Sequence, residues 1–352
     1  MPTDGRKTAQ AVTKLMPADS GTDRRVHLSV EAARELAERA LQGMGYSLDE
    51  ARIIADHVLD AALCGYEYSG LAKLLNVADH PRSRLPRQPV RTVRETNVSV
   101  LLDGGNNVGM LAMRHATRAA IERAQQHGFA LVGLTNSWTS GRGAYYVEMI
   151  AREGLIGIHT ASASRHVAPP GATKAVLGTN PIAFGFPTEC EPLVIDIGTS
   201  AIMATDLKVR ARLGTPLPEG VAIDEHGSPT TDPAAARLGA LLPFGGHKGY
   251  GLALAIRALG VLCQPALDLE KIYGYLIIAI KPDLLVSLDD FRSGVSEAIA
   301  EIKAAPRQEG YREIRIPGER AYRERERRQR EGIEIDARIR DALARYAERA
   351  MT

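Results

Sequence analysis

Short apolar runs alternate with helix-length segments through the middle of the chain, and this alternation restricts the possible folds more than any other feature. Strands are predicted at 98–102, 129–134, 156–161, 182–186, 193–197 and 273–280, and helices at 110–126 and 145–153. Strands that alternate with helices are typical of an α/β architecture, in which helices cover a sheet. We therefore expect an α/β fold.

Helical segments are predicted at both ends of the chain. Ser29 is placed to cap a helix that runs to Leu41, and Ser47 with Glu50 forms a capping-box pattern for a second helix that ends at Gly65. Helices are also predicted at 288–303 and 335–350, with a solvated, charge-rich helix at 319–330. We expect four parts: a disordered extension (1–26), an N-terminal helical, substrate-binding part (27–110) that packs with the C-terminal part, a cofactor-binding α/β domain (111–272), and a C-terminal strand with charged helices (273–352).

The composition excludes several classes of function. The 352 residues carry a formal net charge of +2 and include only five Phe and one Trp, which argues against a nucleic-acid surface. No segment is long and apolar enough for a membrane span or a signal peptide. Cys64, Cys190 and Cys263 are widely spaced, and the histidines lack metal-site spacing. We expect a cytoplasmic protein without a metal site.

A glycine-rich segment leads directly into an apolar helix pattern. It runs from Pro243 to Gly251 and includes His247 and Lys248. Glycines allow close approach of the backbone, and the first amides of a helix attract anions, so the segment suits a phosphate; a plain turn with a solvated lysine is the alternative. The usual Gly-x-Gly-x-x-Gly pattern is absent, because the run that starts at Gly141 has Tyr146 in place of the third glycine.

Four motifs in fixed order resemble the type-2 malate/L-lactate dehydrogenase family. They are Leu-Gly-Thr-Asn-Pro-Ile-Ala from Leu177, Asp-Ile-Gly-Thr-Ser-Ala from Asp196, Gly-Ser-Pro-Thr-Thr-Asp-Pro from Gly227, and Gly-Gly-His-Lys-Gly-Tyr-Gly-Leu-Ala from Gly245. The resemblance extends over roughly 28–333. The family includes ureidoglycolate and sulfolactate dehydrogenases and piperideine/pyrroline-2-carboxylate reductases. The resemblance implies a nicotinamide cofactor, NADPH or NADH, on a non-Rossmann α/β sheet, and a homodimer with sites at the subunit interface.

The same resemblance implies the catalytic and substrate-binding positions. The family's Asp-Ser-His-Gly motif corresponds to Glu67-Tyr68-Ser69-Gly70, so Ser69 replaces the acid–base histidine and Tyr68 replaces the assisting serine, while the orienting Asp196 is retained. Thr139 stands where the family has a second histidine. Lys73 stands where the family has an arginine that binds the substrate carboxylate; it keeps the charge but not the bidentate geometry. A lysine on the surface of a helix is the alternative for Lys73.

The loss of both histidines leaves three interpretations open. Tyr68 replaces the histidine as proton donor, although a phenol is a weak acid at neutral pH and the ring is equally suited to packing. Alternatively, the substrate is a cyclic imine that already carries its proton. In the third interpretation catalysis is lost, and the chain is a binding or partner subunit. His166 is either a replacement donor or a structural histidine.

The cofactor side of the resemblance is better preserved. The residues implied to contact the nicotinamide cofactor are Ser137, Ser140, Gly141, Arg142, Gly178, Thr179, Asn180, Ile197, Gly198, Thr199, Ser200, His247, Lys248 and Gly249. Arg142 either meets a 2′-phosphate or forms an exposed salt bridge. We therefore expect an oxidoreductase that transfers hydride between NADPH or NADH and a small anionic substrate, either a carboxylated cyclic imine or a 2-keto acid.

Overall fold

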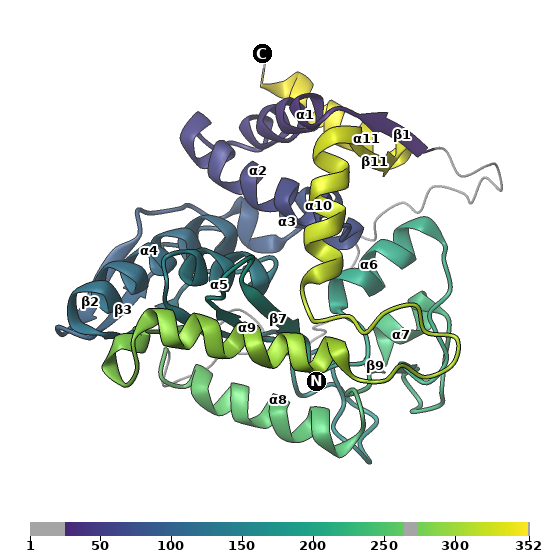
Figure 1. Ribbon diagram of the computed structural model, residues 1–352. Coiled ribbons are helices and arrows are strands. Elements are labelled where there is room, and N and C mark those ends of the chain that lie inside the picture. Colours follow the sequence, from purple (N-terminus) through teal and green to yellow (C-terminus); the bar gives the residue numbers. More distant parts are fainter. Residues whose placement is uncertain (1–24, 264–273, 351–352) are drawn as a thin grey trace, which may run out of the picture.

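The computed structural model describes residues 25–263 and 274–350. Most of the predicted extension (1–26) lies outside these ranges, but Arg25 and Val26 begin a strand. The described chain forms a mixed sheet with helices on both faces, and a helical unit in which α1 and α11, far apart in the sequence, lie side by side (Figure 1). The α/β expectation with helical N- and C-terminal parts is confirmed.

The main sheet has seven strands in the order β2-β3-β4-β10-β5-β6-β7. The strands are β2 (Arg91–Glu95), β3 (Ser99–Asp103), β4 (Phe129–Thr135), β10 (Gly274–Ile280), β5 (Ile156–Ser162), β6 (Ile182–Phe186) and β7 (Leu193–Ile197). Only β3 and β4 pair in parallel, and α4 (Gly109–His127) connects them. The other pairs are antiparallel. The central strand β10 is almost wholly apolar because it is buried between β4 and β5.

Helices cover the two faces of this sheet. α4 and α5 (Gly143–Arg152) lie on one face, and α8 (His247–Gly260) lies on the other (Figure 1). α5 packs so closely on β6 that a Cβ atom at Gly185 would lie 2.3 Å from the carbonyl oxygen of Val147. α4 ends at Gly128, whose φ of +82° is the left-handed conformation that glycine adopts without strain. Of the seven strands, four lie within the predicted cofactor-binding range of 111–272, and β2, β3 and β10 lie outside it.

The helical unit brings together the first and last elements of the described residues. It contains α1 (Val30–Gly43), α2 (Leu48–Leu63), α3 (Ala72–Ala78) and α11 (Ala337–Arg349), with a small sheet of β1 (Arg25–Leu28) and β11 (Ile333–Asp336). Ser29 caps α1, and Ser47 with Glu50 forms the predicted capping box of α2. The helix predicted from Ile335 begins instead at Ala337, because Ile335 lies in β11 and the Asp336 side chain caps the helix.

Four further helices and a short two-stranded sheet complete the described fold. α6 (Ala204–Leu213), α7 (Pro233–Leu238), β8 (Ala222–Ile223) and β9 (Ala240–Leu241) enclose a separate small core. α9 (Leu288–Ala304) lies along the outside of the molecule, and α10 (Glu319–Glu331) connects the sheet to the helical unit (Figure 1). α10 was predicted as a solvated helix. Most of it is, but the Arg325 side chain is only 22% exposed and pairs with Asp60 and Glu148.

Candidate active site

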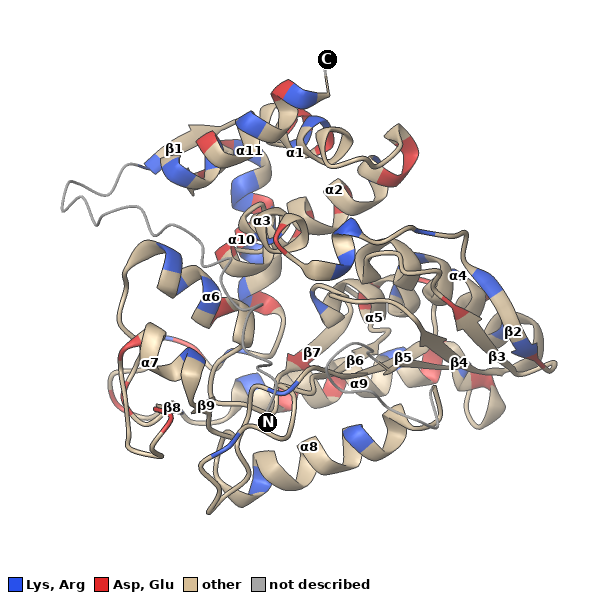
Figure 2. Ribbon diagram, turned by 180° about the vertical axis from the view of Figure 1, so that it is seen from behind, with Lys and Arg blue, Asp and Glu red and all other residues tan. Residues whose placement is uncertain are grey.

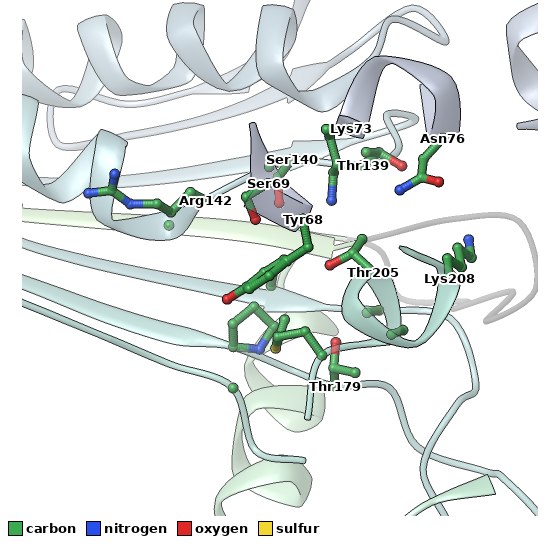
Figure 3. A pocket seen from close by; sticks show the side chains of 18 of the residues that line it. Tyr68, Ser69, Lys73, Asn76, Thr139, Ser140, Arg142, Thr179, Thr205 and Lys208 are labelled. Atoms are coloured by element: carbon green, nitrogen blue, oxygen red, sulfur yellow. The ribbon is translucent and has the colours of Figure 1, made fainter. Parts of the chain in front are cut away.

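A pocket of about 180 Å³ opens where the helical unit meets the sheet (Figure 3). Its walls come from the short 3-10 turn η1 (Glu67–Ser69), α3, the loop before α5, the ends of β5 to β7, and α6. The volume is below the roughly 300 Å³ at which pockets for drug-sized ligands begin, so it suits a substrate of a few carbon atoms.

The pocket brings together Tyr68, Ser69 and Asp196, the three predicted catalytic residues. The ring of Tyr68 extends across the pocket (Figure 3). Burial, the neighbouring Tyr66 and the Asp196 carboxylate raise the pKa of Tyr68 to about 12. A phenol with this pKa is a very weak acid at neutral pH, so the surroundings of Tyr68 work against a role as proton donor.

Asp196 lies at the end of β7, directly in front of α5. Its Oδ2 accepts a hydrogen bond of 2.8 Å from the Ala144 amide in the first turn of that helix, a position that favours a negative charge. The carboxylate is open to the pocket. The surrounding protein nevertheless desolvates it enough to raise its pKa, an effect that the Ala144 amide and Arg142 partly offset. Asp196 is therefore a rigidly held acidic group at one wall.

Lys73 is a buried cation without a counter-ion. The residue is only 5% exposed, and its side chain points into the pocket (Figure 3). No described carboxylate lies within ion-pair distance of it. Burial first, and then the charge of Lys208, lowers the pKa of Lys73 to about 7. An unpaired buried ammonium group is costly, and an anionic ligand would relieve that cost. Thr139, the other predicted substrate-binding residue, also lines the pocket, in a left-handed conformation with φ of +58°.

Two polar residues on the Lys73 side of the pocket were not predicted. The Asn76 side chain is fixed by Arg212, which donates a 2.7 Å hydrogen bond to its Oδ1, while the buried Nδ2 has no partner. Lys208 on α6 also lines the pocket, and burial together with Arg212 lowers its pKa. No motif marks either residue. Their orientation depends on how α3 and α6 pack against each other, which a local pattern does not reveal.

Two histidines line the pocket in different tautomeric arrangements. His80 stacks on Trp138 with ring centroids 4.4 Å apart, and its Nδ1 accepts the Arg82 amide at 3.2 Å, which leaves the proton on Nε2. His166 has its Nδ1 2.9 Å from the Ser164 carbonyl oxygen, so Nδ1 carries the proton. Burial lowers the pKa of both rings, that of His80 to about 4. Both are neutral at pH 7.

The residues expected to bind the cofactor divide into three groups. Ser140, Gly141, Arg142, Thr179 and Gly198 line the pocket itself. Ile197 and Ser200 line an adjoining hollow, into which Gly198 also opens. The other seven line neither cavity; they are Ser137, Gly178, Asn180, Thr199, His247, Lys248 and Gly249.

Several of these residues use their polar atoms inside the protein. Ser137 donates to the Asn107 carbonyl at 2.7 Å, and Thr199 donates to that of Thr179 at 3.0 Å. Asn180 accepts the Ala163 amide at 3.0 Å and donates to Ala253 at 2.9 Å, which connects the end of β5 to α8. These three side chains hold the loops in place.

Arg142 is also engaged inside the protein. Its guanidinium forms a 2.8 Å ion pair with Asp60 and lies over the Tyr66 ring, and its side chain is 8% exposed. The sequence left two alternatives for Arg142, contact with a 2′-phosphate or an exposed salt bridge, and this arrangement matches neither. The ion pair is buried, and the guanidinium that would bind a 2′-phosphate is already paired with Asp60.

The glycine-rich turn before α8 is docked against the loop that follows β7. The Phe244 amide donates to the Thr199 carbonyl at 3.1 Å, and a Cβ atom at Gly249 would lie 2.7 Å from the same oxygen. Gly249 is therefore required for this close contact. His247 and Lys248 are exposed at the start of the helix. The motif that begins at Gly245 therefore contacts the motif that begins at Asp196. His247, Lys248 and Gly249 do not line the pocket.

The described residues contain neither a cluster of metal-ligating side chains nor a membrane-spanning helix. Within 25–263 and 274–350, no group of three or more His, Cys, Asp and Glu side chains is arranged to hold a metal ion. Over the same ranges, no helix is both long enough and apolar enough to cross a membrane.

The site is thus a small pocket with an unpaired cation and an acidic wall, on a non-Rossmann α/β sheet. The relatives of this chain are named as dehydrogenases, a class of oxidoreductases. The family model described as malate/L-lactate dehydrogenase matches residues 28–344. The chain belongs to this family, as its sequence motifs predicted.

Named relatives cover nearly the whole chain. A malate/(S)-sulfolactate dehydrogenase of Methanothermus fervidus is 32% identical over 91% of this chain and 97% of its own length. Hydroxycarboxylate dehydrogenase B of Escherichia coli is 35% identical over 84% of this chain and 86% of its own.

Solved structures agree with this relationship. The sulfolactate dehydrogenase of Methanocaldococcus jannaschii superposes with a TM-score of 0.82 at 31% identity, covering 93% of this chain and 98% of that one. A Δ1-piperideine-2-carboxylate reductase of Pseudomonas syringae superposes with a TM-score of 0.77 at 28% identity, covering 91% and 99%. The chain is thus an oxidoreductase of a family that uses nicotinamide cofactors.

Proposed function

We propose that this protein transfers hydride between NADPH or NADH and a small carboxylated substrate, either a 2-keto acid or a cyclic imine. The observation that carries this proposal is Lys73, a buried ammonium group without a counter-ion in a pocket sized for a small molecule. The substrate carboxylate binds to Lys73, and its reacting carbon lies toward Asp196, Tyr68 and Ser69. The family relationship supports the reaction class.

The residues outside the pocket fit a dinucleotide. Gly246 has a φ of +59°, and a Cβ atom there would meet nothing within 4 Å, so the backbone is open to a ligand. Among the described residues, the amides of Gly246 and His247 have no backbone acceptor, and Lys248 is exposed beside them. Amides and a lysine at a helix start suit a phosphate group. A reduced nicotinamide, when bound, supplies the hydride.

The first test is a titration with NADPH and NADH, followed by nicotinamide fluorescence and thermal shift. Tight binding of one nucleotide selects the cofactor and leads to a screen of 2-keto acids and cyclic imine carboxylates by loss of absorbance at the nicotinamide band. If neither nucleotide binds at millimolar concentration, the proposed function is wrong.

The second candidate is a family member without catalysis that acts as a binding or partner subunit. The observation in its favour is the replacement of both family histidines by Ser69 and Thr139. Tyr68→Ser combined with Ser69→His restores the family residues. If this double variant reduces keto acids while the unaltered protein binds the nucleotide but reduces no candidate substrate, the second candidate is correct.

We also propose that the protein is a cytoplasmic homodimer. α9 buries none of its residues, and apolar side chains are exposed at Leu254 and Leu259 on α8 and at Leu285 before α9. A second copy of the chain covers these surfaces. The three free cysteines suit a reducing compartment. Light scattering on the purified protein should give twice the chain mass, and Leu254→Lys should shift it toward one chain mass; a monomeric unaltered protein would contradict the dimer.

A further inference from the structure

The pocket has lost the usual proton donors of its family. Ser69 and Thr139 do not titrate near neutral pH, and Tyr68 has its pKa raised to about 12. His80 is neutral, with a pKa lowered to about 4, and its Nδ1 accepts a backbone amide. Reduction of a ketone still needs a proton for the oxygen that becomes a hydroxyl. A different group must supply it.

Lys73 lies close to the position of the missing histidine. It follows Ser69 by four residues, and the turn at Gly70 directs both side chains into the same pocket (Figure 3). Serine is much smaller than histidine, so the long lysine side chain reaches into space that an imidazole would otherwise fill. The Lys73 ammonium has three N–H bonds, and no described carboxylate within ion-pair distance accepts any of them.

We infer that Lys73 is the proton donor in ketone reduction as well as the carboxylate-binding residue, an inference that rests on the proposed function. In a 2-keto acid the carbonyl oxygen lies next to a carboxylate oxygen, so one ammonium group can contact both. As hydride from the reduced nicotinamide forms the new C–H bond, the π electrons of C=O move to oxygen. An N–H bond of Lys73 breaks, and its proton forms the O–H bond. The substrate is reduced, the nicotinamide is oxidised, and the neutral amine regains a proton from water.

The charges around Lys73 suit this role. Lys208 of α6 faces it and, together with burial, lowers its pKa to about 7. From α2, His57 is close enough for the charge of Lys73 to lower its pKa, and Arg142 acts on His57 in the same way. His80 and Asp196 are on other walls of the same pocket. The family's arginine could not exchange its proton, because a guanidinium stays protonated at any physiological pH. Lysine in place of arginine thus accompanies the loss of histidine.

Lys73→Arg separates binding from proton donation, since it keeps the positive charge. For a 2-keto acid with the preferred nucleotide, the unaltered protein should lose kcat/KM as pH rises above about 7. Lys73→Arg should lower kcat at least a hundredfold, change KM less than threefold, and remove this pH dependence. Lys208→Gln should move the pH limit upward. The exposed Lys174, changed to Arg, is the matched control.

A combined variant guards against misfolding as the cause of any loss. Tyr68→Ser, Ser69→His and Lys73→Arg together restore the family pattern and should recover at least tenfold in kcat over Lys73→Arg alone. The inference is overturned if Lys73→Arg retains kcat within threefold with the original pH profile, or if the unaltered protein shows no decline in kcat/KM above pH 7. If the unaltered protein reduces cyclic imine carboxylates but no 2-keto acid, the proposed function stands and the inference is wrong; if it reduces neither class, the proposed function fails first and the inference fails with it.

Discussion

Two buried groups of charges, both next to α2, are organised in opposite ways. In the ion-pair cluster of Asp60, Arg142, Glu148 and Arg325, each charge has a partner: Arg142 is 2.8 Å from Asp60, and Arg325 is 2.7 Å from both Asp60 and Glu148. In the pocket, Lys73 has no anionic partner among the described residues, and the charge that acts on its pKa is that of another cation, Lys208.

The comparison distinguishes buried charges that stabilise the fold through ion pairs from a buried charge that is available to bind a ligand. Burial alone would raise the pKa of both carboxyl groups in the cluster. At Glu148, hydrogen bonds and charge from Arg325 reverse this effect and lower the pKa, whereas at Asp60 burial outweighs Arg142 and Arg325 and the pKa is raised. At Lys73 burial and the charge of Lys208 act in the same direction, and both lower the pKa. The cluster connects α10 to α2 and α5, and Figure 2 shows both signs of charge along α10. Paired charges join distant segments, and the unpaired lysine sits in the cavity.

The strongest way to break the comparison is to remove one member of the cluster. Arg325→Met leaves Asp60 and Glu148 with fewer partners in a largely buried place, and should lower the free energy of unfolding by about 3 kcal/mol. Denaturant titration measures this loss. A change below about 1 kcal/mol would mean that water already solvates the cluster.

Removal of the unpaired charge should have the opposite sign. Lys73→Met removes an ammonium group whose burial without a counter-ion destabilises the folded protein. The variant should therefore raise the free energy of unfolding by about 1–2 kcal/mol at pH 7, and it should abolish activity. The same titration, run beside the unaltered protein, tests it. A clear destabilisation would reveal that the ammonium has a stabilising partner.

The pH dependence sharpens the comparison further. The pKa of Lys73 is about 7 in the folded protein and near its ordinary 10.5 in the unfolded chain, so between these values the unfolded chain binds more protons. Stability relative to Lys73→Met should therefore rise with pH across this window, by about 1 kcal/mol per pH unit. Unfolding of both proteins at pH 7, 8 and 9 measures the slope. Parallel curves would contradict it.

The smallest effect is expected at the exposed neighbour of the cluster. Arg327 pairs with Glu324 at 2.9 Å and Glu331 at 2.7 Å, but its side chain is 47% exposed. Solvent screens such pairs, so Arg327→Met should leave the free energy of unfolding almost unchanged. Since it lies on the same helix, it is the matched control for Arg325→Met. A loss equal to that of Arg325→Met would remove the distinction between buried and exposed pairs.

Local signals predicted much of the fold. The serine caps of α1 and α2, the glycine that ends α4, and the bounds of β6 and β7 depend on residues next to one another, and all were found where expected. The pairing of β1 with β11 was missed because each strand has only four residues and its partner is at the other end of the chain. The partial burial of Arg325 was missed for the same reason, since its partners lie on α2 and α5.

The candidate site divides in a similar way. The resemblance named Tyr68, Ser69, Lys73 and Asp196, and these residues do line one pocket. Lys208 and Asn76 belong to no motif. Lys208 approaches Lys73 because α6 packs against α3, whereas Asn76 lies three residues after Lys73 on α3 itself. The absence of a counter-ion for Lys73 is a property of the surrounding side chains in space, which no single segment encodes.

The pairing of β1 with β11 has a consequence for the order of synthesis. α1 and β1 are synthesised well before α11 and β11, against which they pack. The side of α1 that packs on α11 therefore stays uncovered until α11 has been made, and chaperones can protect such a surface in that period. Because β1 pairs with β11, the described part of the chain is also a good subject for circular permutation: connecting Arg349 to Arg25 and opening a distant surface loop would let the helical unit form as one continuous stretch.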